Sequence, residues 1–298
     1  MHADPEAVTA ASPTLSIDDD GVGWLVFDDP QRSVNVLDEP TMRCLAGCLD
    51  EAAERAAAGE LSALVIRSAK SGFIAGADIE AIRGIEDPAA GEDGARMGQA
   101  VFQKLADLPV PTIAAVHGLC VGGGVELSLA CRHRVASDDA STAFMLPEVQ
   151  LGILPAWGGT TRLPRLVGLQ ASLDMLLTGR RVNASKARRT GLVDEVLPAP
   201  ILERLAGDFA RERVRGTPVR RVKRSLLTRL LDGTPPGRAV VLRTARKRVL
   251  EQTGGHYPAP LRILDVLRRG LGRPVAASLE LEARALGELI VTPVSKNL

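Results

Sequence analysis

Apolar runs of strand length alternate with segments of helical spacing, and this alternation limits the fold more than any other feature. The segments at 21–30 ("GVGWLVFDDP"), 61–69 ("LSALVIRSA") and 109–118 ("PVPTIAAVHG") predict strands. Between and after them, residues 41–60 and 122–133 have the spacing and composition of helices. Alternation of this kind predicts an α/β fold. No G-x-G-x-x-G follows a strand, so no dinucleotide-binding domain is expected.

The character of the chain changes near residue 200, which divides it into three predicted parts. Residues 1–13 are small and polar with two prolines, and they predict a flexible lead-in. Residues 14–200 carry the alternating pattern and predict the α/β core. Residues 201–298 are mostly helical in pattern and end in an amphipathic helix at 277–291, so they predict a helical extension.

Composition excludes several classes of protein. With 298 residues, of which 45% are hydrophobic and 24% charged, the chain is neither disordered nor fibrous. No apolar run approaches the roughly 20 residues of a spanning helix, and the first residues lack the apolar segment of a secretory signal. We therefore expect a cytoplasmic protein. The four cysteines and four histidines lack the spacing of zinc ligands, which predicts reduced cysteines and no metal site.

Although the net charge of the chain is only +1, one of its segments is strongly basic. Residues 211–248 hold 13 Lys and Arg against two acidic residues, a net +11 that leaves −10 for the remainder. Such a segment favours an anionic neighbour: a phosphate, an acidic partner, a membrane surface or a nucleic acid. It contains no aromatic residue that could stack on bases, so nucleic acid is not expected. A solvated basic face and contact with a membrane surface both stay open.

Three consecutive glycines, Gly122 to Gly124, stand between a predicted strand and a predicted helix. Glycine lets the backbone approach a ligand closely, and the first N–H groups of a helix are free to face negative charge. This pattern is typical of an anion or oxyanion site, although a plain tight turn explains it equally well. The small residues around Gly76 in "SGFIAGAD" allow the same two interpretations.

Two glutamates accompany these glycines. Glu126 lies in the otherwise apolar "VELSLAC", and glutamate is rarely buried unless it is paired or functional. Glu148 follows Leu-Pro in a predicted loop, because Pro147 and Pro155 interrupt regular structure. Each could be a solvated charge. If both reach one pocket, burial and mutual repulsion raise at least one pKa, which suits acid and base catalysis on a water.

Four ordered motifs together resemble the enoyl-CoA hydratase/isomerase (crotonase) family. They are "IAGADI", "GLCVGGGVEL", "LPEVQLGILPAWGGTTRLPRLVG" and "LTGRRVNASKARRTGLVDEV", and the resemblance covers residues 15–200. The spacing of 22 residues between Glu126 and Glu148 resembles the spacing of the two glutamates in the hydratase part of multifunctional fatty-acid β-oxidation α subunits. The extension resembles their linker to a dehydrogenase, and its abrupt end at Leu298 favours a fragment of a longer protein. The resemblance implies a spiral of ββα units with helices at the C-terminal end.

The resemblance also implies roles for residues. Glu126 and Glu148 match the two catalytic glutamates, with Glu126 activating water and Glu148 protonating Cα. The N–H groups of Ala75 and Gly123 match the oxyanion hole. Further substrate-binding positions are implied at Gly76, Ala77, Asp78, Gly122, Gly124, Pro147, Gly152 and Trp157.

Hydration of a trans-2-enoyl-CoA is the reaction that the resemblance favours, because both glutamates are present. Coenzyme A is then part of the substrate, and no separate cofactor is expected. Isomerisation of the Δ3 to the Δ2 enoyl-CoA, other acyl-CoA enolate chemistry and a non-catalytic assembly module using residues 211–248 stay open as alternatives. The resemblance implies a homo-oligomer or a thiolase-type partner subunit.

Overall fold

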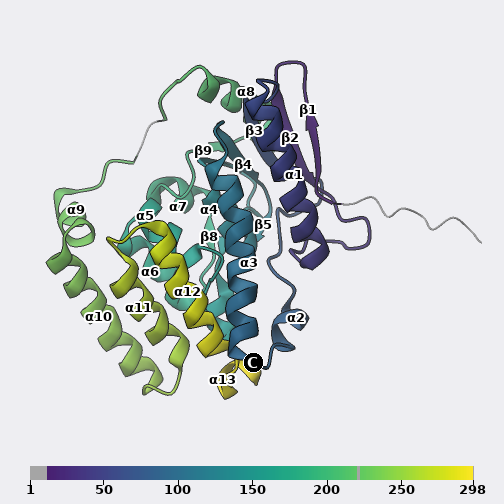
Figure 1. The fold of residues 1–298 in the computed structure, drawn as a ribbon. Coiled ribbons are helices and arrows are strands. Elements are labelled where there is room, and N and C mark those ends of the chain that lie inside the picture. The colour runs from purple at the N-terminus through teal and green to yellow at the C-terminus, as the bar shows by residue number, and fades with distance from the viewer. Residues whose placement is uncertain (1–11, 220–221, 298) are drawn as a thin grey trace, which may run out of the picture.

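The computed structural model describes residues 12–219 and 222–297 as two sheets with helices packed on them (Figure 1). The lead-in predicted at 1–13 lies almost wholly outside the described residues. The larger sheet has the strand order β1-β2-β3-β4-β6-β9. β1 and β2 form an antiparallel hairpin, and the other neighbouring strands are parallel. The predicted α/β class is confirmed. The strands are β1 (Thr14–Ile17), β2 (Val22–Phe27), β3 (Ala63–Ser68), β4 (Thr112–Val116), β6 (His133–Ser137) and β9 (Glu195–Leu197).

A smaller sheet brings the two glycine-containing segments together. It consists of β5 (Leu119–Val121), β7 (Ala143–Met145) and β8 (Val182–Asn183). Isolated parallel bridges join Ile74 to Cys120 and Leu37 to Ala77. The segment 73–77 therefore lies between residues 35–37 and β5. The strand β5 ends immediately before the glycines that begin the next helix.

The central strands are buried on both faces, which explains their continuous apolar runs. Leu64 and Ile66 of β3 join the hydrophobic cluster under α1 (Glu39–Ala57) and α3 (Pro88–Asp107). Ala63 and Val65 face the other way and pack with α8 (Leu202–Val214). The division predicted near residue 200 stays a prediction, but α8 beyond it covers one face of the sheet.

The C-terminal helices pack against the core, and α12 (Val275–Ile290) lies alongside α3 (Figure 1). The other helices are α2 (Ile79–Arg83), α4 (Gly123–Ala130), α5 (Gly159–Val167), α6 (Leu169–Thr178), α7 (Ala184–Thr190), α9 (Leu226–Gly233), α10 (Pro235–Thr253), α11 (Pro258–Gly270) and α13 (Pro293–Lys296), with 3-10 turns η1 (Pro147–Leu151) and η2 (Ala199–Ile201). The loop predicted around Glu148 is wrong in part: Pro147 begins η1, since the first N–H of a helix needs no partner.

Candidate active site

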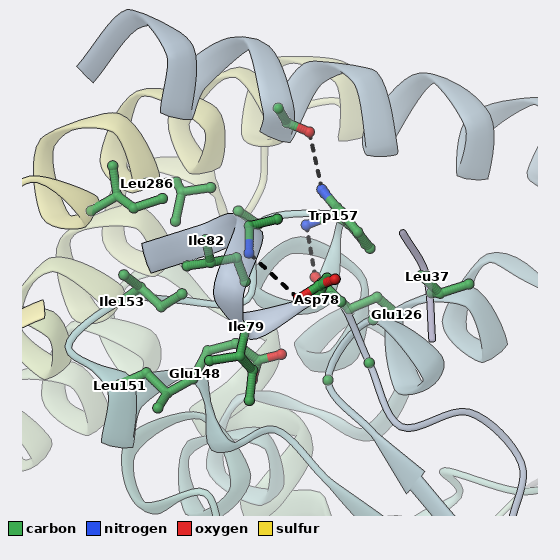
Figure 2. Close-up of a pocket in the computed structure, with 18 of the residues that line it drawn as sticks. Leu37, Asp78, Ile79, Ile82, Glu126, Glu148, Leu151, Ile153, Trp157 and Leu286 are labelled. Atoms are coloured by element: carbon green, nitrogen blue, oxygen red, sulfur yellow. Dashed lines mark hydrogen bonds between the residues drawn. The ribbon is translucent and has the colours of Figure 1, made fainter. Parts of the chain in front are cut away.

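One cavity of about 280 Å³ gathers most of the predicted site residues (Figure 2). Its walls come from the segment 75–79, from Gly122 and Gly123 at the start of α4, from η1 and from α12. Glu126 and Glu148 both line it. Residues far apart in the sequence thus meet because the segment 73–77 lies beside β5.

Glu126 is buried at the centre of this site. Its residue is only 3% exposed, which excludes the alternative of a solvated helix charge. Its Oε1 accepts hydrogen bonds from the backbone N–H groups of Trp157 and Gly159, both at 2.8 Å. Burial raises the pKa of Glu126 to about 7, against the lowering effect of these two bonds and of Arg162. The carboxyl can therefore change protonation state near neutral pH.

Glu148 has the opposite surroundings. The residue is half-buried, yet its Oε2 is shielded from solvent and has no hydrogen-bond partner among the described residues. Burial, and then the charge of Glu126, raises the pKa of Glu148 well above its usual range. A Cβ on Gly122 would lie 2.8 Å from Glu148 Oε1, so glycine is needed for the carboxyl to sit here. The pair combines one carboxylate with N–H donors and one carboxyl that favours its protonated form.

The predicted oxyanion role of Ala75 is wrong. Its backbone N–H donates to the carbonyl oxygen of Asn35 at 2.9 Å and is not free for a ligand. The Gly76 carbonyl oxygen accepts from the Leu37 N–H at 2.8 Å. Because a trans peptide directs its C=O and N–H to opposite sides, the N–H of Ala77 points away from Leu37. Ala77 lines the cavity, and its N–H has no acceptor in the described part of the chain.

Gly123 supplies the second donor. It is the first residue of α4, where the N–H has no partner within the helix and the dipole favours negative charge. No other acceptor for this N–H occurs within residues 12–219 and 222–297. A Cβ on Gly123 would lie 2.9 Å from the Trp157 ring, so only glycine lets the indole pack over the helix start. The Ala77 and Gly123 N–H groups together suit a developing oxyanion.

The remaining predicted residues divide into two groups. Gly76, Ala77, Asp78, Gly122, Pro147 and Trp157 line the cavity. Asp78 also caps α2, accepting from the Glu80 and Ala81 N–H groups. Gly124 and Gly152 are not among the lining residues: a Cβ on Gly124 would meet the Ile74 carbonyl oxygen at 2.7 Å, and one on Gly152 would meet Ser295 Cα at 2.9 Å. These two glycines permit close backbone packing.

Sequence reasoning missed the contribution of the C-terminal helices to this site. Leu286 and Ile290 of α12 line the cavity. Figure 2 shows Leu286 near Ile82 and Ile153, at an apolar end away from Leu37. α12 also brings Glu282, which is fully buried. The signal was present in "LELEARAL", where Glu282 falls on the apolar stripe of an amphipathic helix.

Neither a metal-binding cluster nor a membrane-spanning helix occurs in the described residues. No group of three or more His, Cys, Asp or Glu side chains gathers there as a metal site would require. In that same part of the chain, no helix combines the length and apolar character needed to cross a membrane.

Known sequences resemble this chain over most of its length. A family profile described as enoyl-CoA hydratase/isomerase matches residues 18–249. A fatty acid oxidation complex subunit alpha from Vibrio vulnificus is 42% identical over 290 residues, covering 95% of this chain and 40% of that protein. A protein of the same name from Shewanella amazonensis is 42% identical over 287 residues, covering 96% and 40%. The chain thus spans about 40% of the length of these curated relatives.

Solved structures share the fold. An enoyl-CoA hydratase from Bacillus anthracis is 27% identical with a TM-score of 0.61, covering 94% of this chain and 92% of that one. An enoyl-CoA hydratase/isomerase from Mycobacterium paratuberculosis, 23% identical, has a TM-score of 0.68 with 98% of both chains covered. The predicted crotonase-like fold with C-terminal helices is confirmed. With the family profile covering most of its residues, this chain belongs to the enoyl-CoA hydratase/isomerase family.

Proposed function

We propose that this chain adds water across the double bond of a trans-2-enoyl-CoA to form a 3-hydroxyacyl-CoA. One observation carries the proposal: two carboxyls with contrasting surroundings line one cavity together with Ala77 and Gly123, whose N–H groups have no acceptor among the described residues. The family assignment supports the substrate class. The proposed reaction needs no cofactor beyond the coenzyme A of the substrate.

The two glutamates divide the proton transfers. Glu126, which accepts two N–H groups and has a pKa of about 7, takes a proton from the water as its oxygen bonds to Cβ. Glu148, whose pKa is raised far more, gives its proton to Cα. Glu126 thus gains a proton from the water while Glu148 loses one to Cα, and exchange with solvent restores both carboxyls. Because the carboxyls interact, the titration belongs to the pair.

The backbone donors stabilise the intermediate. Attack at Cβ moves negative charge to the thioester oxygen, and the N–H groups of Ala77 and Gly123 are the proposed donors to that enolate. Fixed donors of this kind contribute about 2.7–4 kcal/mol each to barrier lowering in other enzymes. The dipole of α4 adds to the effect, since Gly123 begins that helix.

The apolar end of the cavity is the proposed place of the acyl chain. Its lining includes Ile153, Ile82 of α2 and Leu286 of α12. The names of the Vibrio and Shewanella relatives describe subunits of a fatty acid oxidation complex. We therefore place the proposed reaction in fatty-acid oxidation, with a homo-oligomer or a thiolase-type subunit as the proposed assembly.

The decisive test replaces Glu148, the proposed proton donor. In Glu148→Gln, hydration of crotonyl-CoA, followed by loss of the ultraviolet absorbance of the conjugated thioester, should fall by at least about 100-fold, as for other acid–base groups. Binding of the acyl-CoA, measured by calorimetry, should persist. Glu80→Gln, at a side chain 82% exposed on α2, is the matched control and should hydrate normally. Normal hydration by Glu148→Gln would contradict the proposed function.

A further inference from the structure

Glu282 is a buried carboxyl on α12, outside the segment that carries the catalytic motifs. Its residue is 0% exposed, and its Oε2 accepts a hydrogen bond from the Gly158 N–H at 3.0 Å. Gly158 lies between Trp157 and Gly159, whose N–H groups both donate to Glu126 Oε1. Three consecutive N–H groups are therefore shared between two buried carboxyls, one from α4 and one from α12.

We infer that Glu282 is a positioning residue for Glu126. Its hydrogen bond with Gly158 fixes the Trp157–Gly159 turn, and the N–H groups of that turn hold the Glu126 carboxylate. The inference rests on the proposed function, in which Glu126 accepts the proton of the water. It gives the C-terminal helices a part in the chemistry that the catalytic motifs do not reveal.

Charged groups on α4 and α5 interact with Glu282. The charge of Glu126 on α4 raises the pKa of Glu282, and Thr161 on α5 lowers it. Arg162 and Arg165, also on α5, interact with the charge of Glu282. On α3, Asp107 acts on Arg162, and Gln103 accepts a hydrogen bond from that arginine at 2.8 Å.

Burial is the main cause that raises the pKa of Glu282 well above its usual range. Its Oε1 has no hydrogen-bond partner among the described residues. Both features favour the protonated carboxyl, which glutamine matches in shape and as an acceptor for the Gly158 N–H.

Removing this acceptor should affect Glu126 in a defined direction. The Gly158 N–H would be left unpaired in a buried place, so the turn would shift. The two N–H bonds that lower the pKa of Glu126 would then weaken, and its pKa would rise. A base with a raised pKa is protonated up to a higher pH. The acidic limb of the rate profile should therefore move upward in pH.

The experiment compares Glu282→Leu with Glu282→Gln in the full chain. For Glu282→Leu we expect kcat to fall by about 10- to 100-fold, the scale of a small misplacement of a catalytic group, with KM changed less than about threefold. The acidic limb should shift to higher pH. Glu282→Gln should retain most of the activity and the wild-type limb. The matched control is Glu280→Leu on the same helix, where Glu280 pairs with Arg96 and Arg284 at a partly exposed position.

Hydrogen exchange at the Trp157 and Gly158 amides supplies a second readout that needs no substrate. Glu282→Leu should accelerate exchange there, and the two other variants should not. Wild-type kcat, pH limb and exchange in a folded Glu282→Leu would overturn the inference. Equal losses in Glu282→Gln and Glu282→Leu would also overturn it, since glutamine keeps the acceptor. If the wild type hydrates nothing while the exchange response appears, the proposed reaction fails and the positioning of Glu126 stands.

Discussion

At the scale of single residues, the site shows how surroundings divide one side-chain type into two roles. Glu126 is almost fully buried but accepts two backbone N–H groups at 2.8 Å, which favour its charge. Glu148 lacks a donor to its buried Oε2 and has the Glu126 charge nearby, and both features oppose ionisation. Sequence could place both glutamates by motif. It could not assign the N–H donors, because those come from a turn 31 residues beyond Glu126.

The pH dependence of hydration should report the interacting Glu126–Glu148 pair, with Glu126 setting its acidic limb. The Glu126 pKa of about 7 lies above the ordinary value of a glutamate carboxyl, so the carboxyl is protonated and unable to accept a proton below neutral pH. We expect kcat/KM for crotonyl-CoA to rise as pH increases through about 7 and to level off above it. Stopped-flow rates between pH 5 and 9 measure this profile. A rate that is flat from pH 5 upward would contradict the assignment of Glu126 as the base.

At the scale of elements, α3 is a helix that propensity alone could not predict. Its sequence "PAAGEDGARMGQAVFQKLAD" contains three glycines, which disfavour a helix. The structure gives two of them a packing reason. A Cβ on Gly91 would lie 2.8 Å from Ile290 of α12, and one on Gly98 would lie 2.3 Å from the Trp157 ring. Tertiary packing therefore selects residues that the local pattern disfavours.

Gly98 and Gly94 lie in the same helix but differ in the space around them, so together they test this conclusion. Helix propensity predicts that either glycine changed to alanine gains up to about 1 kcal/mol. Gly94→Ala should follow that prediction, because a Cβ there meets nothing within 4 Å. Gly98→Ala should instead lose stability by about 1–3 kcal/mol through overpacking against Trp157. Chemical denaturation measures both, and equal stabilisation of the two variants would show that Trp157 can move aside.

Leu286 tests the contribution of α12 to substrate choice. Leu286→Trp should fill part of the apolar end of the cavity. We expect kcat/KM for a sixteen-carbon enoyl-CoA to fall by about tenfold, a loss of about 1.4 kcal/mol. Crotonyl-CoA should be affected less than about twofold, since its chain does not reach that end. Arg284→Trp, on an exposed side of the same helix, is the control. Equal losses with both substrates would place the acyl chain elsewhere.

At the scale of the whole molecule, the predicted extension is part of the folded unit. Its helices contribute Phe209 to the cluster on one face of the sheet, and Ile263 and Leu289 to the cluster on the other. The sequence predicted the strands, the glycine turns and the amphipathic tail from local patterns. It could not predict where those helices dock, because docking depends on complementary surfaces far apart in the chain.

Arginines of the basic segment 211–248 make contacts within the molecule. Arg211 pairs with Asp18 and Asp20 near the first strand, and the Arg213 guanidinium lies 4.3 Å from the Phe209 ring centroid. Arg220 and Arg221 lie outside the described residues. Within the same segment, α9 presents three exposed leucines, Leu226, Leu227 and Leu230. Contact with an anionic membrane surface or an acidic partner stays a prediction.

Truncation tests whether the boundary near residue 200 separates independent parts. A chain ending at Pro200 would lose Leu202 and Phe209, which are 8% and 4% exposed and cover the sheet. Burial of each such side chain stabilises the fold by about 1.5–3 kcal/mol. With α12 removed as well, the total loss reaches about 5–15 kcal/mol, which is the free energy of unfolding of a typical domain. We expect the truncated chain to aggregate or to lack a cooperative thermal transition by calorimetry. A soluble chain with a sharp transition would show instead that residues 14–200 form a self-sufficient core, and that the C-terminal helices serve the site alone.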